Sequence, residues 1–357
     1  MTRSEVALMR LRNQCIAGTM LGTPAEVVRR LGAVQAQDYA GSLWAIGLRT
    51  RDAAEATIER AIEARTIVRT WPMRGTLHFV AAEDVRWLVG LLAPRVMKRM
   101  AGRYRQLGLD EAQFARCRKI LVRALEGGIR RTRPQLYQLF TAAGISMADS
   151  RGLHVLGRFA QEQLICFGSK EGKQPTFVLL DEWVPAGTGM AREEALAELA
   201  RRYFASHGPA TVPDFAWWSG LTLTEVRTSL ALAAAHLSHA SIAGQTYWFA
   251  AAPQAAPRRS PTAYLLPAFD EYTVAYRDRS AVLDPAHSRK AASGGMLSPT
   301  IVVDARVVGT WKRRLAKGSV VVKPEPFAAL SQAVTRAVDA AAQRYADFLG
   351  LAAHVAW

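Results

Sequence analysis

The amino-acid sequence predicts an α+β protein in which helical modules precede a strand-rich C-terminal domain. The first observation is a repeat in the middle of the 357-residue chain, where three short helical segments and then two short strands occur twice in succession. The second is a change of pattern after about residue 256, where strand segments such as GSVVVKPEP replace the helical spacing before one final helix. Half of the residues are hydrophobic, so the chain can bury a sizeable core.

The repeat defines two similar modules, residues 106–189 and residues 190–255. The first has helical spacing in EAQFARCRKILVRALEGG, RPQLYQLFTAAG and DSRGLHVLGRFAQEQ, followed by the short strands LICFG and TFVLL. The second repeats this order with EEALAELARRYFASHG, VPDFAWWSG and LTLTEVRTSLALAAA, followed by the hairpin LSHASIAGQTYWFAA. Three helices and a two-stranded hairpin are the elements of a winged helix-turn-helix, so we predict two such modules here.

Residues 1–105 fit the same plan with an insertion around residues 35–49, which predicts a third winged helix. Its second helix, TPAEVVRRLG, begins with Thr23 as the expected N-cap and Pro24 at the first helical position. IVRTW and TLHFV are expected to form its hairpin, and AEDVRWLVGLLAPRVMKRM a further helix. We predict that residues 256–357 form a β-barrel-like domain with a final helix, joined by the linker AAPQAAPRRSP.

The charge balance is informative, because 46 lysines and arginines against 30 acidic residues give a formal net charge of +16. Such a field favours nucleic acid as a partner over a membrane surface.

No run of 18 apolar residues occurs, so no membrane span is expected. Three scattered cysteines predict no disulfide framework and a cytoplasmic, nucleoid-associated protein. Without Cys/His metal spacing or a phosphate-binding loop, we expect no metal and no organic cofactor.

The most unusual stretch is LGAVQAQDY, in which Gln35 and Gln37 flank a single alanine. In an extended segment residues i and i+2 face the same way, so the two amides would converge on one atom. On a continuing helix they would lie about 200° apart. We therefore expect the preceding helix to end near Gly32 to Val34. The alternative is that both amides only satisfy backbone groups in a loop.

Several basic or polar residues are candidates for contact with DNA. Arg74 is expected at the turn of the first hairpin and His78 on its second strand, while a spacing of three to four residues predicts a basic stripe on the helix that follows. Two arginines lie on the third helix of the second module, which meets DNA in an ordinary winged helix. For each candidate the alternative is a structural role or a solvated side chain. The set is Arg74, His78, Arg95, Lys98, Arg99, Arg103, Arg151 and Arg158.

The adjacent acids Asp270 and Glu271 would point to opposite faces of a strand, which is poor geometry for paired acid–base catalysis. We interpret them as structural residues that brace arginines. Trp217 and Trp218 lie between two short helices, and we expect them in the core rather than in a base-stacking platform.

Taken together, VQAQDY, TWPMRGTLHFV, LICFG, TFVLL, LLPAFDEYTVAYRDRS and IVVDARVVGTWKR resemble the AlkZ/YcaQ family of bacterial DNA glycosylases, from about Leu11 to about Leu349. The resemblance implies three tandem winged helices and a C-terminal β-barrel that form a C shape around a basic, DNA-sized channel. It implies hydrolysis of the N-glycosidic bond of N7-alkylated guanine, the unhooking of interstrand crosslinks in some members, and a self-resistance role in others.

The family's catalytic Gln-x-Gln motif falls on Gln35 and Gln37, as in the AlkZ-like branch. The YcaQ-like branch ends this motif in Asp, and here Asp38 lies one place out of register.

A neutral amide pair suits this chemistry, because N7-alkylated guanine is cationic and leaves as a neutral base. The leaving group needs no proton, so one carboxylic acid of an ordinary glycosidase becomes dispensable. We predict a monofunctional DNA glycosylase for base excision repair that acts as a monomer on double-stranded DNA carrying alkylated guanine. The alternative is a non-catalytic winged-helix DNA-binding protein or transcription regulator, which a base-release assay would distinguish.

Overall fold

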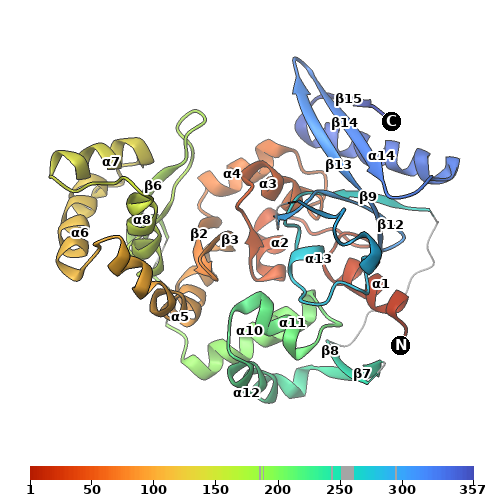
Figure 1. The fold of residues 1–357 in the computed structure, drawn as a ribbon, viewed down its shortest axis with the longest axis horizontal. Coiled ribbons are helices and arrows are strands. Elements are labelled where there is room, and N and C mark those ends of the chain that lie inside the picture. The colour runs from red at the N-terminus through yellow and green to blue at the C-terminus, as the bar shows by residue number, and fades with distance from the viewer. Residues whose placement is uncertain (185, 188, 243, 251–260, 294–295) are drawn as a thin grey trace. The chain divides into compact units, whose positions relative to one another are not determined.

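The computed structural model describes residues 1–184, 186–187, 189–242, 244–250, 261–293 and 296–357 (Figure 1). The chain divides into two compact units, Met1–Ile58 with Leu196–Trp357, and Glu59–Ala195. Helices and antiparallel strands occur in both, so the predicted α+β class is confirmed. The division into four modules stays a prediction, and residues 251–260 of the predicted linker lie outside the described residues.

The N-terminal part of the first unit consists of α1 (Arg3–Asn13), α2 (Pro24–Leu31), the short strand β1 (Val34–Gln35), α3 (Tyr39–Gly47) and the start of α4 (Glu55–Glu63). Thr23 caps α2 and Pro24 occupies its first turn, as predicted. The helix ends at Leu31 because Gly32 adopts a φ of 77°. The prediction that this helix ends before Gln35 is therefore confirmed.

The second unit begins with the hairpin of β2 (Ile67–Met73) and β3 (Thr76–Ala81). Its turn residues Arg74 and Gly75 have φ values of 56° and 80°, which suits the tight turn of a two-residue hairpin. The remaining elements are η1 (Ala82–Asp84), α5 (Val85–Gln106), α6 (Glu111–Leu125), β4 (Arg131–Thr132), α7 (Arg133–Ala142), α8 (Arg151–Gln161), β5 (Ile165–Phe167), β6 (Thr176–Leu179) and α9 (Leu180–Trp183). The predicted order of three helices and a hairpin is present in residues 106–189, around a core that includes Trp71, Phe114 and Phe159.

The same order recurs from α10 (Arg192–Ser206), which begins at the edge of the second unit and continues into the first. It is followed by α11 (Val212–Ser219), α12 (Leu223–Ala233), η2 (Ala234–His236) and the hairpin of β7 (Ser238–Ile242) and β8 (Gln245–Phe249). Thr222 and Glu225 form the predicted capping box at the start of α12. The expected sequence of elements is thus present in this segment, and its identity as a winged helix stays a prediction.

The C-terminal segment contains a five-stranded sheet in the order β15-β14-β13-β12-β9, whose strands are Ala352–Val355, Ser319–Pro326, Arg306–Ala316, Thr300–Val303 and Ala263–Leu266 (Figure 1). Within this sheet β14 and β15 pair in parallel, and the other neighbouring strands pair antiparallel. The sheet has two edges, so it is an open half-barrel rather than a closed barrel. The final helix α14 (Gln332–Leu349) contacts it, and Tyr345 packs against the ring of Trp311.

Shorter elements connect these strands: α13 (Glu271–Val274), η3 (Pro285–His287), β10 (Ala292–Ser293) and β11 (Met296–Leu297). The expectation that Asp270 and Glu271 lie on a strand is wrong. Asp270 is the N-cap of α13 and accepts a hydrogen bond from the backbone N–H of Tyr272, and Glu271 is the first residue of that helix. Among the described residues, no helix is long and apolar enough to cross a membrane.

Candidate active site and DNA-binding surface

The two motif glutamines lie in different environments at the end of β1. Gln35 is the last residue of the strand, and its side chain is only 8% exposed. Its carbonyl oxygen Oε1 is buried and, within the described part of the chain, accepts no hydrogen bond. Gln37 is exposed and lies in the bend between β1 and α3. The extended geometry that would direct both amides to one atom covers Val34 and Gln35 only, so their convergence stays a prediction.

The segment on either side of the motif is held by helix ends. Gly32 ends α2, and Asp38 caps α3 by accepting the backbone N–H of Gly41 at 3.1 Å. Only three residues beyond Gln35, the chain is therefore fixed again by a cap. The carboxylate of Asp38 is used in this way, which agrees with its position one place out of register for a catalytic role.

A buried carboxylate that the sequence did not link to the motif contacts the backbone of Gln35. Glu271 accepts the backbone N–H of Gln35 on Oε1 at 3.0 Å and the indole N–H of Trp218 on Oε2 at 2.9 Å. The ring nitrogen Nε2 of His207 lies 3.4 Å from the same Oε2. Glu271 is 1% exposed. No local pattern indicates a contact across 236 positions; the only signal is that FDEY and VQAQDY belong to one family resemblance.

The neighbouring acid, Asp270, forms a buried ion pair with Arg49, which confirms that it braces an arginine. Its two oxygens accept from the two terminal nitrogens of Arg49 at 2.8 and 2.9 Å. Arg49 also donates to the backbone oxygens of Gln14 and Ala45, both at 2.8 Å. Both charges are fully buried. Burial lowers the pKa of Arg49, but the Asp270 carboxylate, together with Glu271 and Cys15, more than offsets this effect and raises the pKa.

Trp218 and His207, which contact the Glu271 side chain, belong to a buried aromatic cluster. Tyr203 stacks on His207 with ring centroids 4.8 Å apart, and Trp218 lies 5.4 Å from the same histidine ring. Trp218 is fully buried, as expected, whereas Trp217 is half exposed and donates its indole N–H to the backbone of Val274. Burial lowers the pKa of His207, and the Glu271 carboxylate opposes that shift.

The residues predicted on the first hairpin, in the second unit, contact each other. His78 is fully buried, with Nδ1 3.0 Å from the backbone oxygen of Thr76 and Nε2 3.4 Å from a terminal nitrogen of Arg74. Since an arginine can only donate, this pattern assigns the Nδ1–H tautomer. The burial of His78 favours the structural alternative over direct contact with DNA, while Arg74 lies at the turn as predicted.

The basic stripe predicted on α5 is present as an exposed helix face. Arg95, Lys98, Arg99 and Arg103 are all exposed, and the arginines recur every four residues along the helix. Their contact with DNA stays a prediction, but the side chains are accessible to phosphates.

Arg151 and Arg158 have partners within the second unit. Arg158 donates to both oxygens of Glu111 at 2.9 Å and to Glu162 at 2.6 Å, and its guanidinium lies 4.0 Å from the ring centroid of Phe114. Arg151 donates to the backbone oxygens of Ser146 and Leu107. These bonds favour a structural role for both arginines, because the acids neutralise Arg158 and the loop carbonyls hold Arg151 in place.

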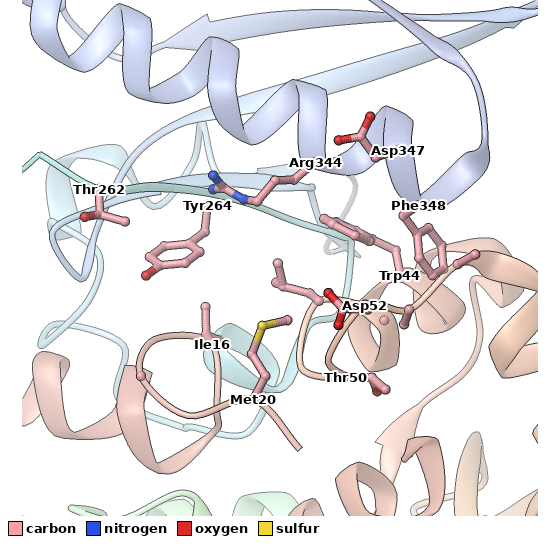
Figure 2. A pocket seen from close by; sticks show the side chains of 15 residues that line it. Ile16, Met20, Trp44, Thr50, Asp52, Thr262, Tyr264, Arg344, Asp347 and Phe348 are labelled. Atoms are coloured by element: carbon pink, nitrogen blue, oxygen red, sulfur yellow. The ribbon is translucent and has the colours of Figure 1, made fainter. Parts of the chain in front are cut away.

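A separate cavity of about 620 Å³ opens in the first unit, between the N-terminal segment and α14. Figure 2 shows aromatic side chains, among them Trp44, Tyr264 and Phe348, together with Arg344 from α14. None of the predicted catalytic or DNA-binding residues lines it. Among the described residues, no group of three or more His, Cys, Asp or Glu side chains is placed to hold a metal ion.

In sequence and in fold the chain matches DNA glycosylases. The family model described as "DNA glycosylase AlkZ-like" matches residues 28–348, so the protein belongs to this family. A relative from Streptomyces sahachiroi, named "Interstrand DNA cross-link repair glycosylase", is 26% identical over 337 residues, which cover 90% of each chain. The solved structure of the Streptomyces sahachiroi DNA glycosylase AlkZ matches with a TM-score of 0.81 and 23% identity over 100% of both chains, which supports the fold.

Proposed function

We propose that this protein hydrolyses the N-glycosidic bond of N7-alkylated guanine in double-stranded DNA, with Gln35 and Gln37 as its catalytic residues. The observation that carries the proposal is the carbonyl oxygen of Gln35, which is buried without a hydrogen-bond partner in the described part of the chain. A buried acceptor without a donor costs about 1–3 kcal/mol, so such an atom is expected where a ligand or a water molecule completes the bond.

The reaction needs two contributions from the protein. One is a water molecule held on the face of the sugar opposite the departing base, and an amide carbonyl accepts a hydrogen bond from such a water. The other is stabilisation of the positive charge that develops on the sugar, toward which a carbonyl dipole is favourable. Because the base leaves as a neutral molecule, no general acid is required. We therefore assign a monofunctional hydrolytic mechanism without a metal or an organic cofactor.

The substrate class follows from the surface as well as from the motif. A guanine crosslinked to the opposite strand cannot be extruded fully into a closed pocket, so an enzyme for such lesions needs an open basic surface. The net charge of +16 and the exposed stripe on α5 suit this requirement. The name of the relative supports the extension to interstrand crosslinks.

We propose that three winged-helix modules and the C-terminal sheet enclose the DNA in a C shape. We also propose that the enzyme acts as a cytoplasmic monomer in repair or self-resistance.

A base-release assay on defined adducts tests this function. Duplexes that carry one N7-methylguanine, one bulky N7 adduct or one nitrogen-mustard crosslink are incubated with the protein, and abasic sites are detected by alkaline cleavage. We expect release from at least one adduct, and its loss in the double variant Gln35→Ala/Gln37→Ala at unchanged DNA affinity. If no adduct is released while the duplex is bound, the protein is a non-catalytic DNA-binding protein. If release survives in the double variant, these glutamines do not carry the reaction.

A further inference from the structure

A buried carboxylate accepts the backbone N–H of the proposed catalytic residue Gln35. Glu271 has one oxygen on the backbone N–H of Gln35 at 3.0 Å and the other on the indole N–H of Trp218 at 2.9 Å. It is 1% exposed and lies at the start of the short helix α13. Burying an ionised carboxylate costs free energy unless hydrogen bonds or charges compensate it, so the burial of Glu271 needs an explanation.

The placement of Glu271 is fixed from both sides. The preceding residue, Asp270, is held by the bidentate ion pair with Arg49, and it caps the helix that carries Glu271. On the other side, Trp218 is buried beneath Gly32, whose ideal Cβ position would lie 3.4 Å from the indole ring. The carboxylate is thus anchored between α11 and α13 and has little freedom to follow a displacement of β1.

The hydrogen bond from Gln35 to Glu271 restrains the part of the motif that determines where the amide points. The hydrogen bond holds the backbone nitrogen of Gln35 in place, and the extended backbone of β1 then sets the Cα–Cβ direction from which the side chain starts. No hydrogen bond among the described residues holds the side-chain carbonyl oxygen of Gln35 in position. The restraint therefore has to come from packing and from the backbone.

We infer that Glu271 is a positioning residue of the glycosylase: by accepting the Gln35 backbone N–H, its carboxylate holds the Gln35 amide in the reactive geometry and places negative charge behind it. The carboxylate contacts the backbone of the residue that carries the amide, and a negative charge there favours the developing cation on the sugar. The inference rests on the proposed function of Gln35. It also explains how neutral glutamines serve in place of a catalytic carboxylate, since a buried carboxylate is present at the backbone N–H of Gln35.

The experiment compares two buried carboxylates of the first unit that differ in their contact with the motif. Asp214 is as buried as Glu271 and accepts backbone N–H groups of Arg277 and Asp278, but its hydrogen bonds do not reach Gln35. Glu271→Gln and Asp214→Asn are each measured for thermal unfolding, for affinity to an N7-methylguanine duplex, and for the single-turnover rate of base release. The rate is measured at a temperature where circular dichroism shows both variants folded.

Both substitutions are expected to lower the unfolding temperature, but only Glu271→Gln is expected to slow release, by about tenfold to a hundredfold at unchanged DNA affinity. A wild-type rate in Glu271→Gln, or an equal loss in Asp214→Asn, overturns the inference. If the wild-type protein releases no base, the proposed function fails instead, so the two failures are distinguishable.

A second variant covers the case in which Glu271→Gln does not fold. Gln35 is replaced by its α-hydroxy analogue with a chemically acylated suppressor tRNA, which exchanges only the backbone N–H for an ester oxygen. The Gln35 and Glu271 side chains both remain. A slower release at unchanged affinity supports the positioning role, and a wild-type rate contradicts it.

Discussion

Replacing Asp270 by asparagine tests how much the buried ion pair between Asp270 and Arg49 stabilises the protein. Asparagine is nearly isosteric and remains a good helix N-cap, so the hydrogen bond to the backbone of Tyr272 can persist. What changes is the charge opposite Arg49, whose side chain is fully buried. Removing one partner of a buried pair leaves an uncompensated charge and costs about 3–5 kcal/mol. The exposed pair Lys312–Glu325, in which the lysine side chain is 72% exposed, should contribute at most about 1 kcal/mol.

The assay is urea unfolding followed by tryptophan fluorescence. With a slope of about 3 kcal/mol/M, the midpoint should fall by about 1 to 1.7 M urea in Asp270→Asn. Glu325→Gln is the control and should shift the midpoint by no more than about 0.3 M. Adding Arg49→Met to Asp270→Asn should restore part of the loss, because it removes the unpaired charge. If Asp270→Asn costs no more than Glu325→Gln, the reasoning from burial is refuted.

Three further predictions concern binding, packing and pH. Arg99→Ala and Arg103→Ala should each weaken DNA binding and reduce the slope of log affinity against log salt by about one; an unchanged slope would show that α5 does not contact phosphates. Gly152→Ala should destabilise the second unit by about 1–3 kcal/mol, because the added Cβ would lie within 2.2 Å of the Tyr137 ring; calorimetry with an unchanged melting temperature would contradict this. Because burial lowers the pKa of His207 below its ordinary value of 6.5, the unfolded chain takes up its proton first on acidification. Stability should therefore decline as the pH falls below about 6.5, and the decline should be smaller in His207→Gln; equal declines in both proteins would exclude His207 as its source.

Local signals in the sequence were sufficient where neighbouring residues decide the structure. The end of α2 before Gln35 follows from Thr23 and Pro24 at its start and Gly32 at its end, and all three act as predicted. The first hairpin is similar, because Arg74 and Gly75 form the turn between β2 and β3. Capping and turn chemistry depend on only a few consecutive residues, so one sequence is enough to predict them.

Contacts between distant positions could not be predicted in the same way. Nothing near Gln35 indicates that Glu271, 236 residues later, accepts its backbone N–H. The sequence predicts that Asp270 pairs with an arginine, but it does not identify Arg49 as that arginine, because the ion pair spans 221 positions. The place of Arg158 on α8 predicts contact with DNA, yet Glu111, 47 residues earlier, pairs with it. Such contacts depend on tertiary packing, which overrides local pattern.

The most direct measurement compares Gln35→Ala with the wild-type protein in single-turnover release of N7-methylguanine from duplex DNA, with affinity for the same duplex measured in parallel. The buried carbonyl of Gln35, which has no hydrogen-bond partner among the described residues, predicts that release falls by about a hundredfold or more in the variant, because the water is no longer positioned, while the affinity stays unchanged. Release at the wild-type rate from the Gln35→Ala protein would contradict the assignment of catalysis to this amide.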